Sequence, residues 1–290
     1  MPPEISAFVN SFVVPVGLIA IMFSMGLSLR LADFAEVGRN PVAVGVGLTA
    51  QLVAMPPLAL AVAWLFALPS PMAAGLFLLA ICPGGVTSNA ITFAAKANVA
   101  LAVVLTSLSS LITVFTIPIL ARWGLQHLYV GGEAPELSIV STMAQLAIMT
   151  VIPIALGMAL RKAAPVFAER AAPYLRPASL VVLIVVIGFS VIASASLLLA
   201  NLVRAGPAIW TLNALGMAIG LGLAALIGLD PKDRLTIAIE AGVHNATMAT
   251  LLTLSILKDL SLAIAPTLYG VVMLLNAGLL VRWLQRRRSA

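Results

Sequence analysis

The segment Cys82–Ala90, CPGGVTSNA, interrupts an apolar stretch with a proline, two glycines and three polar residues. A second interruption, Glu240–Ala246 with the sequence EAGVHNA, lies inside another apolar stretch. Each stretch is long enough to cross a bilayer, where unwound backbone is tolerated only beside protein or a water-filled cavity. Paired interruptions of this kind indicate the binding site of a secondary transporter.

The composition excludes an ordinary soluble domain, because 62% of the 290 residues are hydrophobic and only 9% are charged. We predict an all-α polytopic membrane protein, with residues 1–290 forming a single transmembrane domain of about nine spans. The predicted spans are Ala7–Leu29, Val42–Leu68, Met72–Ala95, Val99–Leu120, Leu137–Leu160, Pro177–Leu199, Gly206–Leu229, Leu235–Leu257 and Ser261–Leu284.

Two further features limit the possibilities. Cys82 is the single cysteine, which excludes an intramolecular disulfide and a cysteine metal cluster. The first span follows Pro2-Pro3-Glu4 with no basic leader, so we expect no cleaved signal peptide.

Basic residues are distributed unequally between the two sets of loops. Only three of the 16, Arg122, Arg204 and Lys258, fall on one side. By the positive-inside rule the N-terminus is expected outside and the C-terminus in the cytoplasm of a cytoplasmic (inner) membrane. The basic run Arg286–Arg288 is then interpreted as an anchor to the bilayer surface, so we expect no nucleic acid as a partner.

In this topology the two interrupted spans, the third and the eighth, are antiparallel and five helices apart. That arrangement is typical of an inverted repeat. A weak internal sequence similarity, between Ser88-Asn89-Ala90 and His244-Asn245-Ala246, agrees with an inverted repeat. A five-helix repeat predicts ten spans, so we interpret the chain as a ten-helix plan that lacks its first helix.

Glu240 is the only acidic residue inside a predicted span, and an ionisable group there is by default a functional-site hypothesis. Glu240 lies six residues beyond Arg234, about 9 Å along a helix, so a position near the interface is the alternative. The neighbouring Gly242, His244 and Asn245 favour a site, because three polar side chains around a glycine are difficult to attribute to packing.

The residue types suit a small hard cation such as sodium. Thr87, Ser88 and Asn89 supply hydroxyl and amide oxygens, and Glu240 supplies the charge. We expect Gly84, Gly85 and Gly242 to expose backbone N–H groups to the anionic part of a substrate.

Other polar residues have less specific interpretations. Gln51 is more typical of interhelical hydrogen bonding than of ion ligation, and Thr106, Ser107, Ser109 and Ser110 are typical of helix contacts. Glu240 and His244, one helical turn apart, would also suit a proton relay. The sequence contains no motif of a hydrolase or nucleotide-binding enzyme.

The chain resembles the bile acid:sodium symporter family over nearly its full length. The residues that carry the resemblance are Met22–Leu29 with Asp33-Phe34, Cys82–Gly85 through Ser88-Asn89, Ala97–Leu101 and Glu240–Asn245.

The resemblance implies a six-helix core packed on a smaller panel, with the two broken helices crossing in the core. It also implies sodium-coupled uptake of organic anions by alternating access. The first sodium site would comprise Ser88, Asn89, Thr106 and Glu240. The second would comprise Gln51, Glu240, Ala241, Val243 and His244, with Asn245 beside the substrate cavity.

Two residues depart from the family pattern. Ala102 stands where a serine ligand of the first site is usual, and His244 stands where a glutamine of the second site is usual. The number of coupled sodium ions, one or two, is therefore left open.

The predicted function is import of a small organic anion by sodium symport, with no organic cofactor. The anion would be bile acid-like, a keto acid or a pantothenate-pathway acid, and we assign Asn245, Asn89, Thr87, Gly85 and Gly242 to it. A proton-coupled transporter using Glu240 and His244 is the first alternative, and a membrane sensor without turnover is the second. The sequence indicates no oligomeric state.

Overall fold

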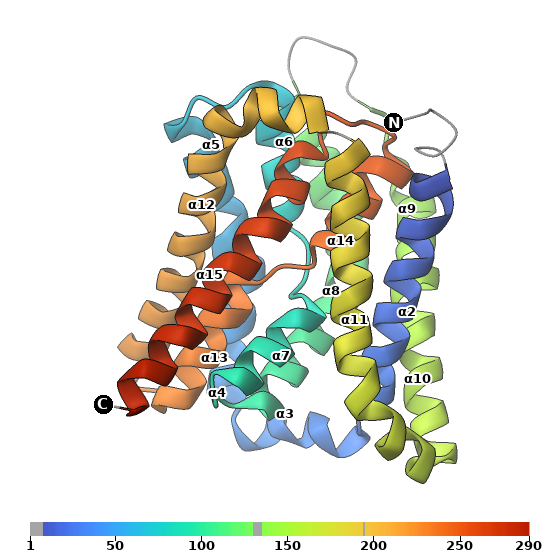
Figure 1. Cartoon of the computed structure of the whole chain (residues 1–290), viewed down its shortest axis with the longest axis vertical. Coiled ribbons are helices and arrows are strands. Elements are labelled where there is room, and N and C mark those ends of the chain that lie inside the picture. Colours follow the sequence, from blue (N-terminus) through green and yellow to red (C-terminus); the bar gives the residue numbers. More distant parts are fainter. Residues whose placement is uncertain (1–7, 130–134, 194, 290) are drawn as a thin grey trace.

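The computed structural model describes residues 8–129, 135–193 and 195–289, and these ranges are helical almost throughout. The long helices run side by side along the long axis of the molecule (Figure 1). The described ranges contain no strand, only an isolated antiparallel bridge between Gly84 and His244. The predicted all-α polytopic fold is confirmed.

The described helices form nine consecutive spans, of which seven are uninterrupted. These seven are η1–α2 (Val9–Val13, Val14–Ser28), α4–η3–α5 (Pro41–Leu48, Thr49–Ala54, Met55–Leu65), α8 (Val99–Leu128), α9–η4–α10 (Ile139–Leu146, Ala147–Val151, Ile152–Ala163), α11 (Pro165–Ala193), α12 (Ala195–Leu226) and α15 (Ile264–Ser289).

The third and eighth spans are interrupted, as the sequence predicts. They are α6 with α7 (Ser70–Ala80, Val86–Ala94) and α13 with α14 and η5 (Pro231–Gly242, Ala246–Thr250, Leu251–Ile256). Two short elements, η2 (Leu31–Phe34) and α3 (Ala35–Arg39), connect the first two spans. Six helices are long and apolar enough to cross a membrane, and α6 and α14–η5 are shorter apolar helices.

Several predicted boundaries are wrong. Helix α8 continues to Leu128, beyond the predicted end of the fourth span at Leu120. Helix α11 starts at Pro165, not at position 177, because a proline in the first turn of a helix sacrifices no hydrogen bond. Helix α12 starts at Ala195, so Arg204 lies in a helix. The predicted positions of Met1 and Ala290 fall outside the described residues.

Prolines inside the spans explain three π-helical turns. The turns η1, η3 and η4 end immediately before Val14-Pro15, Met55-Pro56-Pro57 and Ile152-Pro153. Proline has no N–H and its ring clashes with the preceding turn, so the helix widens locally. Gln51, one of the residues predicted for the candidate site, lies in the π-helical turn η3.

The helices form two groups. Helices α2, α10 and α11 pack together on one side, which we call the panel, and the other six spans form the core (Figure 1). Gly157 of α10 allows close packing against α2 in the panel, because a Cβ atom there would lie 2.6 Å from the backbone nitrogen of Leu27. Small residues of this kind let transmembrane helices approach closely.

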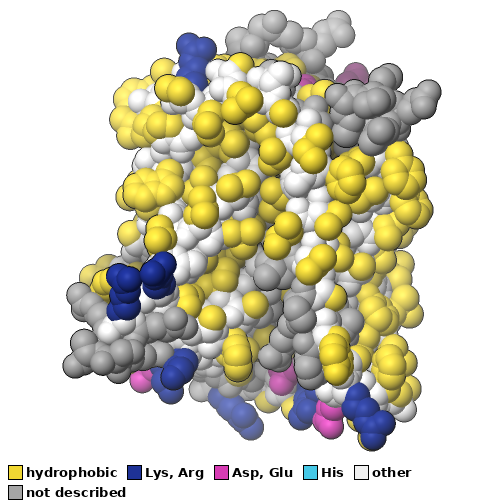
Figure 2. Space-filling model, viewed as in Figure 1, with side chains coloured by type: hydrophobic (Ala, Val, Ile, Leu, Met, Phe, Trp, Pro, Cys, Tyr) yellow, Lys and Arg dark blue, Asp and Glu magenta, His cyan; other side chains and the backbone are white. Residues whose placement is uncertain are grey.

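The surface agrees with a bilayer environment. Figure 2 shows hydrophobic side chains over the middle of the molecule, with lysines and arginines mostly at the lower end. That end carries the C-terminus of α10 and the N-terminus of α13 (Figure 1). A wide apolar belt with charged ends is what a multi-pass membrane protein presents to lipid.

The fold predicts opposite accessibility for Glu136 and Lys232, which are exposed at opposite ends of the bundle. In a Cys82→Ala background, a cysteine at position 136 should react with an impermeant maleimide added outside. A cysteine at position 232 should react only after the membrane is opened. Labelling of both positions from one side would contradict the nine-span arrangement.

Candidate ion and substrate site

The two interruptions meet at the middle of the core. Helices α6 and α13 enter from opposite ends of the molecule, and the segments that follow them cross (Figure 1). Gly85 N–H donates to Val243 O at 2.9 Å, and Asn245 N–H donates to Pro83 O at 2.8 Å. Each interruption therefore supplies hydrogen-bond partners that the other needs, which is how unwound backbone persists at membrane depth.

The interruptions are shorter than the sequence suggested. Helix α7 begins at Val86, so Ser88 and Asn89 lie in its first turn. Helix α13 continues through Gly242, and only Val243 to Asn245 are unwound. The predicted break at Gly242 is wrong, and so is the one-turn helical spacing between Glu240 and His244.

Glu240 is at the centre of the site and is fully buried. The hydroxyl of Ser88 donates to Oε1 of Glu240, and the hydroxyl of Thr106 donates to Oε2 at 2.9 Å. The two hydroxyl oxygens lie 3.3 Å apart. No lysine, arginine or histidine in the described ranges forms an ion pair with this carboxylate. The ion pair that those ranges contain joins Arg30 and Glu169, away from the site.

Gly84 makes the compact arrangement possible. A Cβ atom at this position would lie 2.6 Å from Oε2 of Glu240 and 2.7 Å from Nε2 of Gln51. Its backbone N–H is directed to the hydroxyl of Ser109 at 3.4 Å. The glycine is therefore required for space at the carboxylate.

The residues expected to form a second sodium site hydrogen-bond to one another. Gln51 Nε2 donates to the carbonyl of Glu240 at 3.1 Å, while its Oε1 is buried without a partner. The ring nitrogens of His244 lie 3.0 Å from Cys82 O and 3.1 Å from Ala241 O. The carbonyl of Val243 accepts the N–H of Gly85. Side-chain nitrogens of Gln51 and His244 thus lie against the carbonyls of Glu240 and Ala241.

Three of the five predicted substrate residues, Gly85, Thr87 and Asn245, line a small cavity between core and panel, whereas Asn89 and Gly242 are not part of its lining. It has a volume of about 20 Å³, enough for one water molecule. Ile21 of α2 lines it from the panel. The core side is lined by Gly85, Val86, Thr87, His244, Asn245, Ala246, Thr247 and Met273.

The polar groups at this cavity are only partly paired. Asn245 Oδ1 accepts the N–H of Met248 at 2.9 Å, but its Nδ2 is buried without a partner. Outside the lining of this cavity, Asn89 Oδ1 is also buried and unpartnered. The expectation of free N–H groups at the glycines is wrong for this conformation, because those of Gly84 and Gly85 are hydrogen-bonded and Gly242 is helical.

Sequence reasoning missed a layer of residues behind the site. The carbonyl of Gly242 accepts hydrogen bonds from Asn213 Nδ2 at 2.6 Å and Tyr269 OH at 2.9 Å. Asn276 donates in turn to Asn213 Oδ1 at 2.7 Å. An asparagine in each of two apolar helices was a usable signal, because buried amides in membrane helices need partners.

A second missed cluster lies where three core helices begin. The carboxylate of Asp233 accepts from Asn40 Nδ2 and from Asn98 Nδ2, each at 2.7 Å. The two asparagines also cap α4 and α8 through their side-chain oxygens. This cluster ties α4, α8 and α13 together and fixes the helix that carries Glu240.

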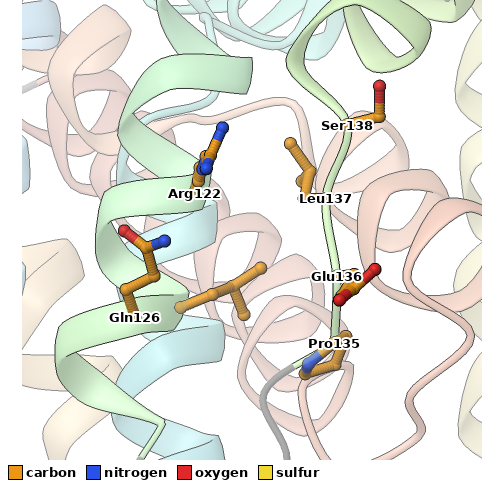
Figure 3. Close-up of a pocket in the computed structure, with 7 residues that line it drawn as sticks. Arg122, Gln126, Pro135, Glu136, Leu137 and Ser138 are labelled. Atoms are coloured by element: carbon orange, nitrogen blue, oxygen red, sulfur yellow. The ribbon is translucent and has the colours of Figure 1, made fainter.

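A larger cavity, of about 350 Å³, lies at the other end of the core. Arg122 and Gln126 of α8 line it on one side, and the segment from Pro135 to Ser138 faces them (Figure 3). None of the predicted site residues is part of it.

The central arrangement is suited to a hard monovalent cation. A desolvated carboxylate needs a cation or a proton, and hydroxyl, amide and carbonyl oxygens complete such a site. The described residues contain no group of three or more histidine, cysteine or acidic side chains that would hold a multivalent metal. Two broken helices with a lone buried carboxylate at their crossing are typical of a secondary transporter.

Comparison with known proteins agrees with this class. Residues 15–201 match the Sodium Bile acid symporter family. The uncharacterized sodium-dependent transporter YocS of Bacillus subtilis is 29% identical, over 98% of this chain and 86% of its own length. The probable sodium/metabolite cotransporter BASS2 of Oryza sativa is 31% identical over 98% of this chain and 67% of its own. Human sodium/bile acid cotransporter 4 is 27% identical over 90% of this chain and 60% of its own length.

The chain belongs to the Sodium Bile acid symporter family. It is thus a sodium-coupled membrane transporter and not an enzyme, and the resemblance seen in the sequence is confirmed.

We predict that Gly84→Ala removes sodium binding without unfolding the protein. The added Cβ meets the ends of two flexible side chains, Glu240 and Gln51, so they shift while the backbone stays. The measurement is the melting temperature of the purified protein in sodium chloride and in choline chloride. Gly222→Ala is the control, because no atom lies within 4 Å of its added Cβ. An unchanged sodium response in Gly84→Ala would contradict the assignment.

Proposed function

We propose that the protein imports a small organic anion by sodium symport through alternating access. The observation that carries the proposal is the buried carboxylate of Glu240 at the helix crossing, held by two hydroxyl groups and no cationic side chain of the described chain. Its negative charge is costly in that environment unless a cation is bound. Substrate transport would therefore be coupled to sodium, because the buried carboxylate is most stable when the cation is bound.

Ser88, Thr106 and Glu240 are the proposed sodium ligands, with Asn89 beside them. Support comes from the hydrogen bonds among the first three and from the buried, unpartnered Oδ1 of Asn89. Ala102, on the same helix as Thr106, adds no side-chain oxygen. The unpartnered amide oxygen is a suitable replacement.

The proposed substrate is an anion because two helix N-termini meet at the cavity. Helix α7 begins next to Gly85, and α14 begins next to Asn245. The positive ends of helix dipoles favour a carboxylate, and Asn245 Nδ2 and the Thr87 hydroxyl are available as donors. Bile acid-like compounds, keto acids and pantothenate-pathway acids are the proposed classes. The relatives' names mention bile acid and metabolites.

Alternating access is proposed because the cavity of about 20 Å³ is too small for any organic anion. The panel and the core meet at this cavity through Ile21. A rigid displacement of the panel would enlarge it towards one side of the membrane at a time.

We propose that one sodium ion is coupled, not two. An N–H directed at a carbonyl leaves a positive hydrogen where a cation would sit, and Gln51 directs one at Glu240 O. His244 occupies the space between Cys82 O and Ala241 O. The remaining oxygens gather around the carboxylate of Glu240.

The proton-coupled alternative has less support. The carboxylate of Glu240 accepts hydrogen bonds from Ser88 and Thr106, whereas the ring nitrogens of His244 face the carbonyls of Cys82 and Ala241 and not this carboxylate. The sensor alternative predicts binding without accumulation of substrate.

We propose that the protein lies in the cytoplasmic (inner) membrane, with the basic end of the bundle in the cytoplasm.

Glu240→Gln should abolish the response to sodium while leaving the protein folded. We expect sodium, compared with choline at equal ionic strength and pH, to raise the melting temperature of the native protein by about 2–4 °C at ten times the dissociation constant. The glutamine variant should not respond, and its melting temperature in choline should be higher because a buried charge is gone. Glu169→Gln, at an exposed acid, is the matched control. A sodium response retained in Glu240→Gln would rule out the proposed site, and an imposed pH gradient driving uptake without sodium would favour proton coupling.

His244→Gln tests the number of ions. We expect a Hill coefficient of about 1 for sodium-dependent stabilisation of the native protein, because one site is available. Glutamine frees the carbonyl of Ala241 and supplies an oxygen, so the coefficient should rise towards about 2. A coefficient well above 1 in the native protein would contradict the single-ion proposal.

A further inference from the structure

A third cavity opens at the basic end of the panel, far from the helix crossing. It has a volume of about 610 Å³ and lies where α2 ends, α10 ends and α11 begins. Three basic side chains line it, Arg30, Arg161 and Lys162, together with the acid Glu169. Leu29 and Met158 contribute apolar walls.

The basic groups are only partly neutralised. Arg161 donates one N–H to the carbonyl of Leu27 at 2.7 Å, which leaves most of its five donors available. Lys162 has no hydrogen-bond or ion-pair partner among the residues that the structure describes. Arg30 pairs with Glu169 at 3.0 Å, but both are more than half exposed, and such pairs are weak. The cavity therefore has a net positive charge.

The surroundings of the cavity are apolar and face the bilayer. Leu156 on α10 and Val166 and Phe167 on α11 are each more than half exposed. Figure 2 shows the lower end of this side with basic side chains directly below a hydrophobic surface. A ligand that fits has an anionic head and a long apolar tail.

We propose that this cavity binds the phosphate head group of an anionic phospholipid, whose acyl chains lie along α10 and α11. Guanidinium and ammonium groups bind phosphate oxygens through charge-assisted hydrogen bonds. Basic pockets between membrane helices on the cytoplasmic side are suited to such head groups. The bound lipid would bridge the three panel helices and stabilise the panel as one body.

The test uses the full chain, purified in detergent and depleted of lipid. Its melting temperature is measured with added phosphatidylglycerol, phosphatidylcholine, or glycerol phosphate as a soluble anion. We expect phosphatidylglycerol to raise the melting temperature by about 2–4 °C more than phosphatidylcholine, and high salt to reduce the difference. Native mass spectrometry should detect one retained phosphatidylglycerol molecule.

Two variants locate the site. Arg161→Gln and Lys162→Gln should each lose most of the phosphatidylglycerol effect, whereas Lys232→Gln, exposed at the same end but outside the cavity, should keep it. Should Arg161→Gln fail to fold because Leu27 loses its donor, Lys162→Gln alone decides. Equal effects of the two lipids, or unaltered binding in Lys162→Gln, would overturn the proposal. An equal effect of glycerol phosphate would also overturn it, in favour of a site for soluble anions.

Discussion

The whole site depends on the exchange of backbone hydrogen bonds between two unwound segments. A peptide group left unpaired in the hydrocarbon region costs several kcal/mol, so neither interruption would be stable alone. The pairs Gly85–Val243 and Asn245–Pro83 remove that cost reciprocally. They also fix the crossing point of the two spans, and this brings Ser88 to the carboxylate of Glu240, 152 positions away in the chain.

The second constraint is electrostatic. A permanent arginine or lysine partner would stabilise the carboxylate of Glu240 but would leave no place for a mobile ion. The described part of the chain instead surrounds this carboxylate with hydroxyl groups, and none of its lysine or arginine side chains forms an ion pair with it. The charge thus remains available to a transported cation, which is the property that a coupled transporter needs.

The sequence predicts the interruptions and the acid well, because bilayer physics allows few explanations for glycine and polar residues in an apolar span. It does not predict which hydroxyl faces the acid. Four hydroxyl residues lie close together on α8, and only Thr106 reaches Glu240, because the rotation of the helix is set by packing. The interpretation of Thr106 from composition alone, as a packing residue, was therefore weaker than the one drawn from the family resemblance.

The start of α11 and the role of Gly242 illustrate a different limit. Pro165 was expected in a loop, yet it occupies the first position of a helix, a place that its missing N–H tolerates. Gly242 was expected to unwind α13, yet it is helical and leaves space for the side chain of Met217. In both cases residue type alone does not distinguish a break from close packing, because the neighbour that decides is distant in sequence.

Coupling between ion and substrate has a short physical route in this structure. Ser88 hydrogen-bonds to Glu240, while the adjacent Thr87 lines the cavity. Successive side chains on a helix point about 100° apart, so one turn of α7 faces both the proposed ion site and the cavity. Gly85 begins that turn and is also hydrogen-bonded to Val243, next to His244 in the cavity wall. An ion that draws Ser88 and Glu240 together would therefore move both sides of the cavity at once, without any longer pathway through the protein.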